Sequence, residues 1–311
     1  MWEIKTRYCG EVKRLKLSAV VIMYNPASLG KEVAEKNILA YSSFVGRVYV
    51  VDNSCEDNSL LCENIQNAVY IPLGKNEGIA TALNIGCHRA LNDGFEWCMT
   101  MDQDSHWDAD ELALYINKIK EKLSCNLDIK SFSPTIRSSM GHSVLGDIKR
   151  RLLHSLGVCG KTLPDEEFCD RVICSGNVIN LNSWESLGGF LEDLFIDEVD
   201  YEFCYRLREE GWQILKLNGV HLDHILGEPK KTFFPLSNHG GVRLYYIFRN
   251  MMYVNYLHPD FGKKYRYGKL MIMRVIANVI VTSPSRMLQG VRCLFRARTD
   301  FKIMKKRNVE K

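Results

Sequence analysis

The sequence predicts an α/β domain built on a mainly parallel sheet, because short apolar runs alternate with segments of helical spacing. Each apolar run stops at polar residues, as buried strands do where they reach the edge of a sheet. The predicted strands are Leu17–Met23, Arg47–Val51, Val69–Pro72 and Phe95–Met101. The predicted helices between them are Lys31–Tyr41, Asp57–Gln66 and Gly78–Leu91, with Asn76 as a cap near the start of the last one.

The pattern is weaker in residues 125–170, where we expect a strand at Ser131–Thr135 and a loop over the binding site. A strand, a helix and another strand are predicted after this region, at Val172–Leu181, Phe195–Glu210 and Trp212–Leu217. The histidines His221 and His224 follow the last of these strands.

Length and composition allow one large domain, or one domain with an extension, since the chain has 311 residues of which 46% are hydrophobic. Eleven scattered cysteines without a C-x-x-C motif favour reduced thiols in a cytosolic protein over a disulfide framework or a zinc site. The N-terminal stretch MWEIKTRYCGEVKRLK has no apolar core, so we expect no secretory signal peptide there.

A ligand site is expected at the carboxyl ends of the parallel strands, where this class of sheet binds its ligands. The first strand–helix turn lacks G-x-G-x-x-G and the chain has no G-x-x-x-x-G-K-[ST], which argues against a dinucleotide or P-loop site. Asp102 and Asp104 follow a buried strand directly, and two such carboxylates tolerate each other when a hard cation such as Mg²⁺ or Mn²⁺ lies between them. The alternative is a solvated loop whose acidic residues serve as turn and cap residues.

Six segments along the chain carry a family resemblance. In order they are VVDNS (50–54), GKNEGIATALNIG (74–86), MDQDS (101–105), CSGNVI (174–179), GGFLEDLFIDEVDYEFCYRLREEGW (188–212) and HILG (224–227). Together they resemble family 2 glycosyltransferases with the GT-A fold, and among these the bacterial rhamnosyltransferases of surface-polysaccharide assembly. The resemblance covers about residues 17–255. CSGNVI departs from the family, which more often has Ser or Thr after the glycine.

The resemblance implies a nucleotide-sugar site and a role for each matching residue. Asp52 would bind the nucleoside base, and Asp102 would contact the ribose or the metal shell. The other residues expected around the nucleotide sugar are Tyr24, Asn25, Lys75, Asn76 and Gln103. The start of the helix at Gly78 would also offer unpaired N–H groups to the phosphates.

The metal site and the catalytic base are likewise implied by the family pattern. Asp104 and His224 would hold Mg²⁺ or Mn²⁺, whereas the spacing of His221 fits the pattern less well. Asp200 would be the base, although Asp197 lies three residues earlier and would share a helix face with it.

The implied reaction is inverting transfer of L-rhamnose from dTDP-L-rhamnose to a saccharide acceptor, expected to be lipid-linked, in O-antigen biosynthesis. Alternatives are the same fold with a UDP-hexose or UDP-galactofuranose donor, or a non-catalytic subunit that binds a glycan or a sugar nucleotide. Arg243, Arg249 and Asn250 could meet an anionic acceptor.

The C-terminus is expected to be a separate part, with a catalytic domain at 1–258 and a basic helical extension at 259–311. Residues 263–311 carry 14 Lys/Arg against two acidic residues. Leu270–Thr282 is too short to cross a bilayer, which takes about 20 apolar residues. Together with a second apolar stripe (Met287, Leu288, Val291, Leu294 and Phe295), it is expected to lie on the anionic inner face of a bacterial membrane. The alternative is a helical hairpin packed on the catalytic domain, and no motif suggests a nucleic-acid partner.

Overall fold

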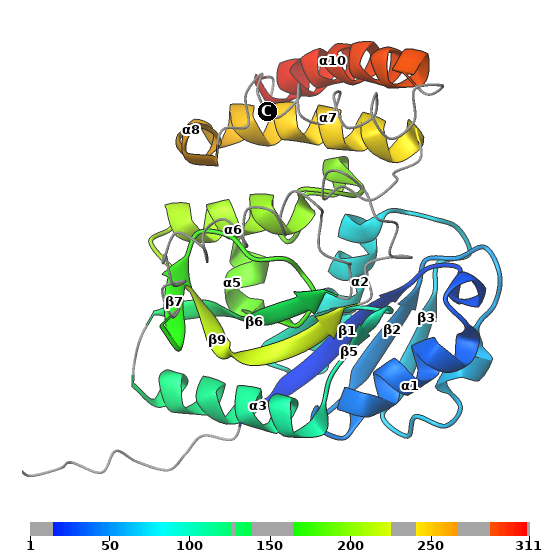
Figure 1. The fold of residues 1–311 in the computed structure, drawn as a ribbon, viewed down its shortest axis with the longest axis vertical. Coiled ribbons are helices and arrows are strands. Elements are labelled where there is room, and N and C mark those ends of the chain that lie inside the picture. Colours follow the sequence, from blue (N-terminus) through cyan, green and yellow to red (C-terminus); the bar gives the residue numbers. More distant parts are fainter. Residues whose placement is uncertain (1–14, 126–127, 139–163, 225–240, 266–286, 310–311) are drawn as a thin grey trace, which may run out of the picture.

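One mixed sheet forms the centre of the molecule in the computed structural model, which describes residues 15–125, 128–138, 164–224, 241–265 and 287–309 (Figure 1). Within these ranges nine strands join in the order β3-β2-β1-β4-β8-β6-β9-β5, and β7 pairs with β9. The predicted α/β class is therefore confirmed. The strands are β1 Leu17–Met23, β2 Val48–Asp52, β3 Ala68–Pro72, β4 Trp97–Asp102, β5 Ser105–His106, β6 Ile129–Ser138, β7 Glu166–Cys169, β8 Asn177–Asn180 and β9 Gln213–His224.

The first four strands are parallel and lie within two residues of their predicted bounds. β1 pairs with both β2 and β4, and β2 pairs with β3. Every residue of β1 and β2 is buried, which explains why their sequences are continuous apolar runs rather than alternating ones. The carboxyl ends of these strands therefore meet at one edge of the sheet.

The second half of the sheet is mixed, and here the predicted strand bounds are less accurate. β8 is antiparallel to both β4 and β6, while β9 runs parallel to β6. The predicted strand at Val172–Leu181 is reduced to β8, because Leu181 already begins a helix after the cap at Asn180. The last strand is longer than predicted, so His221 and His224 lie within β9 and not after it.

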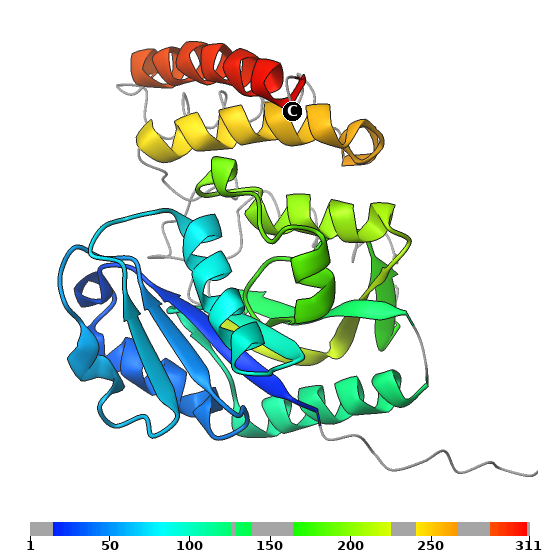
Figure 2. The ribbon, with the colours of Figure 1, turned by 180° about the vertical axis from the view of Figure 1, so that it is seen from behind.

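Helices cover both faces of the sheet. The helices are α1 Lys31–Ser42, α2 Ile79–Asn92, α3 Ala109–Ser124, α5 Leu181–Ser186, α6 Val199–Glu209, α7 Gly241–Leu257, α8 Pro259–Tyr265 and α10 Met287–Val309, with short 3-10 helices η1 Pro26–Ser28, η2 Ser59–Cys62 and η3 Glu192–Leu194. α1 and α3 lie on one face, and α2, α5 and α6 lie on the other (Figure 2). One buried apolar cluster fills each side of the sheet.

Two predicted helices are wrong in extent. Asp57–Gln66 contains only the short η2, since Asp57 and Asn58 use their side chains to hold local turns rather than a helix. Phe195–Glu210 is helical only from Val199, because Phe195, Asp197 and Glu198 have left-handed backbone conformations, with φ of 64°, 62° and 66°. Asp197 and Asp200 therefore do not share a helix face.

The C-terminal helices α7, α8 and α10 form a further layer over α6 (Figure 1). Leu294, Ala297 and Phe301 of α10 face inward, where Leu294 and Ala297 pack with Leu244 and Phe248 of α7. α8 and α10 are helical, while a separate extension at 259–311 stays a prediction. Of the second apolar stripe, Leu294 packs on the protein, as the hairpin alternative expected, whereas Val291 and Phe295 are exposed. The side chains of Met287 and Leu288 lie outside the described part of the chain. Leu270–Thr282 lies outside the described residues. None of the described helices combines the length and the apolar character needed to cross a membrane.

Candidate active site

A cavity of about 310 Å³ opens at the carboxyl ends of the parallel strands. Six of the ten predicted site residues line it: Tyr24, Asn76, Asp102, Gln103, Asp104 and His224. Gly78, at the helix start expected to face the phosphates, and Arg243 also line the cavity. Residues that the sequence did not single out for this site complete the wall, namely Ile22, Asn53, Ile79, Phe195 and Ile196. The structure therefore brings together residues up to 221 positions apart in the chain, from Ile22 to Arg243.

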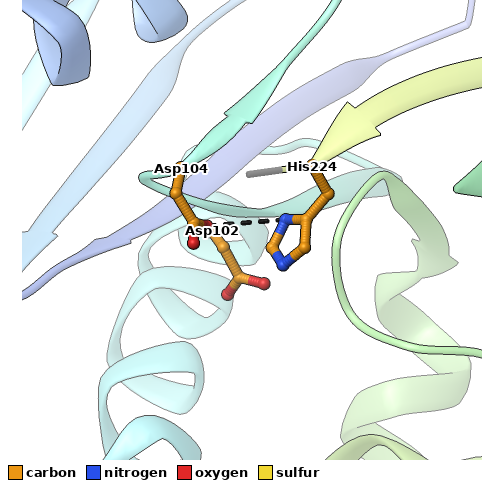
Figure 3. A group of neighbouring side chains, drawn as sticks. All are labelled: Asp102, Asp104 and His224. Carbon is orange, nitrogen blue, oxygen red and sulfur yellow. Dashed lines mark ion pairs between the residues drawn. The ribbon is translucent and has the colours of Figure 1, made fainter. Parts of the chain in front are cut away.

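A carboxylate–histidine cluster lies in this cavity (Figure 3). Asp102 ends β4, Asp104 follows in the turn before β5, and His224 ends β9. Each offers one ligand atom, and these atoms lie within 4.8 Å of one another. The pairing of β5 with β9 sets Ser105 opposite His224, which brings the imidazole beside Asp104 with Nδ1 3.5 Å from Oδ1.

The charges of the cluster favour a divalent cation. Burial raises the pKa of Asp104, the nearby His224 opposes that rise, and the charge of Asp102 adds to it. The two carboxylates are ligands that suit Mg²⁺ or Mn²⁺, the imidazole offers a third ligand atom, and a cation would relieve the repulsion between the carboxylates. Ser105 Oγ lies 2.6 Å from His224 Nδ1 and fixes the orientation of the ring.

Asp200 lies beside this cluster, at the start of α6. Its carboxylate accepts hydrogen bonds from the backbone N–H groups of Cys174, at 3.2 Å, and Tyr201, at 2.9 Å. Cys174 also points its Sγ at Asp102 (3.5 Å), and Ser175 Oγ donates a short hydrogen bond to Asp102. Burial raises the pKa of Asp200 to about 7, and the negative charge of Asp102 contributes to the rise. A carboxylate with such a pKa can accept a proton near neutral pH.

Asp197, the other candidate base, is held by a different partner. Its side chain forms an ion pair with Arg243, whose Nη2 lies 3.0 Å from Oδ1. Arg243 is half-exposed and lines the cavity, as the expected role in binding an anion requires. Asp197 is therefore engaged with a cation, whereas the donors to Asp200 among the described residues are the backbone N–H groups of Cys174 and Tyr201.

Asp52 is buried behind the cavity and does not line it. Its carboxylate accepts hydrogen bonds from Ser54 N (3.0 Å), Asn58 Nδ2 (2.9 Å) and the Tyr70 hydroxyl (2.6 Å). These bonds shape the turn after β2, from which Asn53 reaches the cavity. Asn53 is a site residue that the motif VVDNS contained but that sequence reasoning missed.

The remaining predicted nucleotide-binding residues lie on the turns around the cavity. Gln103 and the backbone of Tyr24 exchange two hydrogen bonds, at 3.0 and 2.9 Å, which tie the turn after β1 to the turn after β4. Asn76 accepts from Asn53 Nδ2 and Gly78 N, so it supports the entry to α2 without capping the helix itself. Asn25 and Lys75 lie outside the cavity wall: Asn25 N donates to Ser54, and Lys75 pairs with Glu77.

His221 lies outside the cavity. Side chains alternate along a strand, so residues three apart such as His221 and His224 point to opposite faces of β9. The Nδ1 of His221 lies 3.3 Å from Glu111 Oε1 on α3. The weaker match of His221 to the family pattern thus agrees with its place in the fold.

Comparisons with known proteins identify the family of the chain. The family described as Glycosyl transferase family 2 matches residues 18–137, which include β1 to β5 and the two aspartates. A dTDP-rhamnosyl transferase of Shigella flexneri, RfbF, is 31% identical over 248 residues, which cover 75% of this chain and 77% of that protein.

Two solved structures show the same fold at low sequence identity. The mannosyltransferase PcManGT from Pyrobaculum calidifontis, in complex with GDP-Man and Mn²⁺, has a TM-score of 0.51 at 16% identity, covering 95% of this chain and 79% of its own. GalNAc-T7 with UDP, GalNAc and Mn²⁺ has a TM-score of 0.54 at 14% identity, covering 77% of this chain, which spans 48% of that longer protein. At these identities the likeness concerns the fold alone, and it is the GT-A fold that the sequence predicts.

Proposed function

Because the chain belongs to glycosyl transferase family 2, we propose that it is an inverting, metal-dependent rhamnosyltransferase that moves L-rhamnose from dTDP-L-rhamnose to a saccharide acceptor. The observation that carries the proposal is the pairing of a carboxylate–histidine cluster with a separate carboxylate, Asp200, whose pKa is about 7. The choice of donor is supported by the 31% identity to the Shigella flexneri transferase.

Asp200 is the base of the proposed reaction. It takes the proton of an acceptor hydroxyl as that oxygen bonds to the anomeric carbon, while the bond from this carbon to the diphosphate oxygen breaks. The dTDP leaves with the bonding electrons, and a single displacement of this kind inverts the anomeric configuration. A pKa raised to about 7 lets Asp200 accept a proton near neutral pH.

Asp102, Asp104 and His224 would hold the cation, Mg²⁺ or Mn²⁺, at the diphosphate. A bound divalent ion supplies electrostatic stabilisation of the negative charge on a departing diphosphate. The N-terminus of α2 would also stabilise the diphosphate. Gly78 and Ile79 line the cavity there, and the dipole of the helix favours an anion at this end.

The turns after the first strands would bind the nucleotide. Tyr24 and Gln103 line the cavity and hold each other, while Asp52 shapes the turn that presents Asn53. The expected contacts of Asn25, Asp52 and Lys75 with the nucleotide require the ligand to reach beyond the cavity wall. We therefore propose that Asp52 holds the turn that binds the nucleoside base, in addition to any direct contact with the nucleotide.

The extension at 259–311 would place this site at a membrane. α10 carries seven Lys/Arg against Asp300, and its outer face combines exposed apolar residues with cations. Phe295 is 69% exposed and Val309 72% exposed, and Arg298 and Lys302 are exposed on the same side. Such a face suits the anionic inner leaflet of a bacterial membrane, where a lipid-linked oligosaccharide acceptor of O-antigen assembly would be available.

A donor screen tests the proposal. Purified protein with Mn²⁺ and lipid-linked oligosaccharide would be offered dTDP-L-rhamnose, UDP-hexoses and UDP-galactofuranose, and the product linkage would be read by NMR. We expect transfer from dTDP-L-rhamnose with inversion. Preference for a UDP sugar would contradict the donor assignment. If none of the donors is turned over, the result would favour a non-catalytic binding subunit.

A further inference from the structure

The segment between η3 and α6 has an unusual backbone. Phe195, Asp197 and Glu198 all have positive φ, a conformation that L-residues rarely adopt. Three such residues within four positions persist only where surrounding groups hold them. The segment leads directly into α6, where Asp200 lies in the first turn.

Asn250 of α7 holds this segment. It is fully buried, and its Nδ2 lies within hydrogen-bond distance of three carbonyl oxygens, those of Leu194 (2.8 Å), Ile196 (2.6 Å) and Asp197 (2.9 Å). An amide nitrogen has two hydrogens, so it donates to these three acceptors in shared hydrogen bonds. On the sequence pattern Asn250 could meet an anionic acceptor, but its amide faces the backbone carbonyls instead.

Arg249 fixes the direction of this amide. Its Nε donates to Asn250 Oδ1 at 2.9 Å, which leaves the NH₂ group facing the carbonyls. The same guanidinium reaches the carbonyl oxygens of Asp193 (2.6 Å) and Leu194 (3.0 Å) through Nη2. Two neighbouring residues of α7 therefore bind the backbone of residues 193–197.

The segment also forms part of the site. Phe195 and Ile196 line the cavity, and the ring of Phe195 stacks on Tyr246 of α7 with centroids 4.9 Å apart. The carbonyl oxygen of Phe195 accepts a hydrogen bond from Ile79 N, at 2.6 Å, the first residue of α2. One short segment thus joins the cavity wall, the entry to α2 and the start of α6.

We infer that Asn250 is a positioning residue for glycosyl transfer: by holding the carbonyls of Leu194, Ile196 and Asp197 it sets the cavity wall and the place of Asp200. It does not itself line the cavity. The inference rests on the proposed function, because it takes Asp200 as the base.

The test uses Asn250→Asp, which keeps the size of the side chain but replaces both N–H donors with an acceptor facing three carbonyls. Arg249→Lys is the milder second variant, because it keeps the charge but loses the Nε that orients the amide. Asn92→Asp makes the same chemical change at an exposed position at the end of α2. Full-length variants would be compared by release of dTDP from dTDP-L-rhamnose with Mn²⁺ and lipid-linked acceptor, and by Mn²⁺ affinity.

For Asn250→Asp we expect kcat per folded molecule to fall roughly 10- to 100-fold, because displacement of reacting groups by about 1 Å has effects of this size. Arg249→Lys should show a smaller loss in the same direction. The Mn²⁺ affinity of both should stay within about twofold of wild type, since the cation ligands lie on β4, β5 and β9, and Asn92→Asp should match wild type.

Unchanged kcat per folded molecule in Asn250→Asp, with only a lower melting temperature, would make the residue purely structural and overturn the inference. If Asn250→Asp does not fold, Arg249→Lys decides in the same way. Asp200→Asn run in parallel separates the two claims. An active Asp200→Asn means that the proposed base is wrong, whereas an inactive Asp200→Asn beside fully active Asn250 and Arg249 variants overturns the positioning role alone.

Discussion

The pKa values of two carboxyl groups in this site are both raised, although the proposed roles of the two residues differ. Burial raises the pKa of both Asp104 and Asp200, and the charge of Asp102 adds to each rise. Asp104 lies beside His224 and would hold a cation, whereas Asp200 accepts hydrogen bonds from backbone N–H groups in the described part of the chain and would take a proton. The surroundings of each residue, and not its chemical type, separate the two roles.

The base is tested by Asp200→Asn. We expect it to lower turnover by roughly 10²- to 10⁴-fold, the usual contribution of a positioned general base, and to leave donor and Mn²⁺ binding in place. In the wild type, kcat/KM should rise with pH through about 7 and level off above it, since the ionised form acts. Asp197→Asn is the comparison: if it is inactive while Asp200→Asn turns over normally, Asp197 is the base.

The same substitution should stabilise the fold at neutral pH. The pKa of Asp200 is raised from 3.8 to about 7, so the folded state prefers the protonated acid, and wild-type stability relative to Asp200→Asn falls as pH rises between these values. The melting temperatures of the two proteins in EDTA should therefore be similar below about pH 4 and differ most above about pH 7, with Asp200→Asn the higher. A gap that does not change with pH would contradict the raised pKa.

The metal site is tested by Asp104→Asn. Loss of one of two carboxylates should weaken Mn²⁺ binding and abolish transfer, as EDTA should in the wild type, without lowering the melting temperature. Asp110→Asn, an exposed residue of the first turn of α3, is the control and should bind Mn²⁺ normally. Full activity of the wild type in metal-free buffer would refute the assignment.

At the scale of elements, the entry to α2 depends on a glycine. Gly78 has φ 88° and ψ 164°, a conformation essentially confined to glycine. A Cβ there would lie 2.5 Å from the Phe195 ring and 2.7 Å from the Phe195 carbonyl oxygen. The tight approach lets Ile79 N reach that oxygen, so the cavity wall and the helix start are built as one unit.

Gly78→Ala should therefore lower the free energy of unfolding by more than backbone strain alone would. Gly94 also has a positive φ, 85°, but has open space around it. We expect Gly94→Ala to lower the free energy of unfolding by about 1 to 2 kcal/mol, and Gly78→Ala by about 2 to 5 kcal/mol because overpacking adds to strain. Denaturant unfolding measures both, and equal losses would show that the contact with Phe195 relaxes freely. Only Gly78→Ala should also impair donor binding.

At the scale of the whole molecule, the C-terminal layer contacts both the site and the surroundings. The inner face of α10 packs on α7, and α7 binds the segment before Asp200 through Arg249 and Asn250. The outer face of α10 carries Phe295 and cations. Deletion of α10 would expose Leu244 and Phe248, so truncation is expected to cause aggregation, and substitutions on the outer face are the cleaner test of membrane contact.

The combined variant Phe295→Ser, Arg298→Glu, Lys302→Glu should bind vesicles containing phosphatidylglycerol at least about tenfold more weakly than wild type, because each cation at an anionic surface contributes about 1 kcal/mol. Binding by the wild type should also fall with added salt. The control is the double variant Leu60→Ser, Lys36→Glu. Both residues are exposed and lie in the first quarter of the sequence, outside α10. Equal vesicle binding by wild type and the α10 variant would remove the membrane proposal, while activity on a short soluble acceptor should be the same in both.

The sequence by itself determined the first strands, α2, and the place of Asp102 and Asp104 at a strand end. These features depend on neighbouring residues in the chain, namely apolar runs and the polar residues that end them. Tertiary structure decided what depends on pairing between distant segments. His224 reaches Asp104 only because β5 pairs with β9, and Asn250 finds its three carbonyls 53 to 56 residues earlier in the chain. The left-handed turn before Asp200 was missed for the same reason: its local sequence favours a helix, and contacts from α7 outweigh that preference.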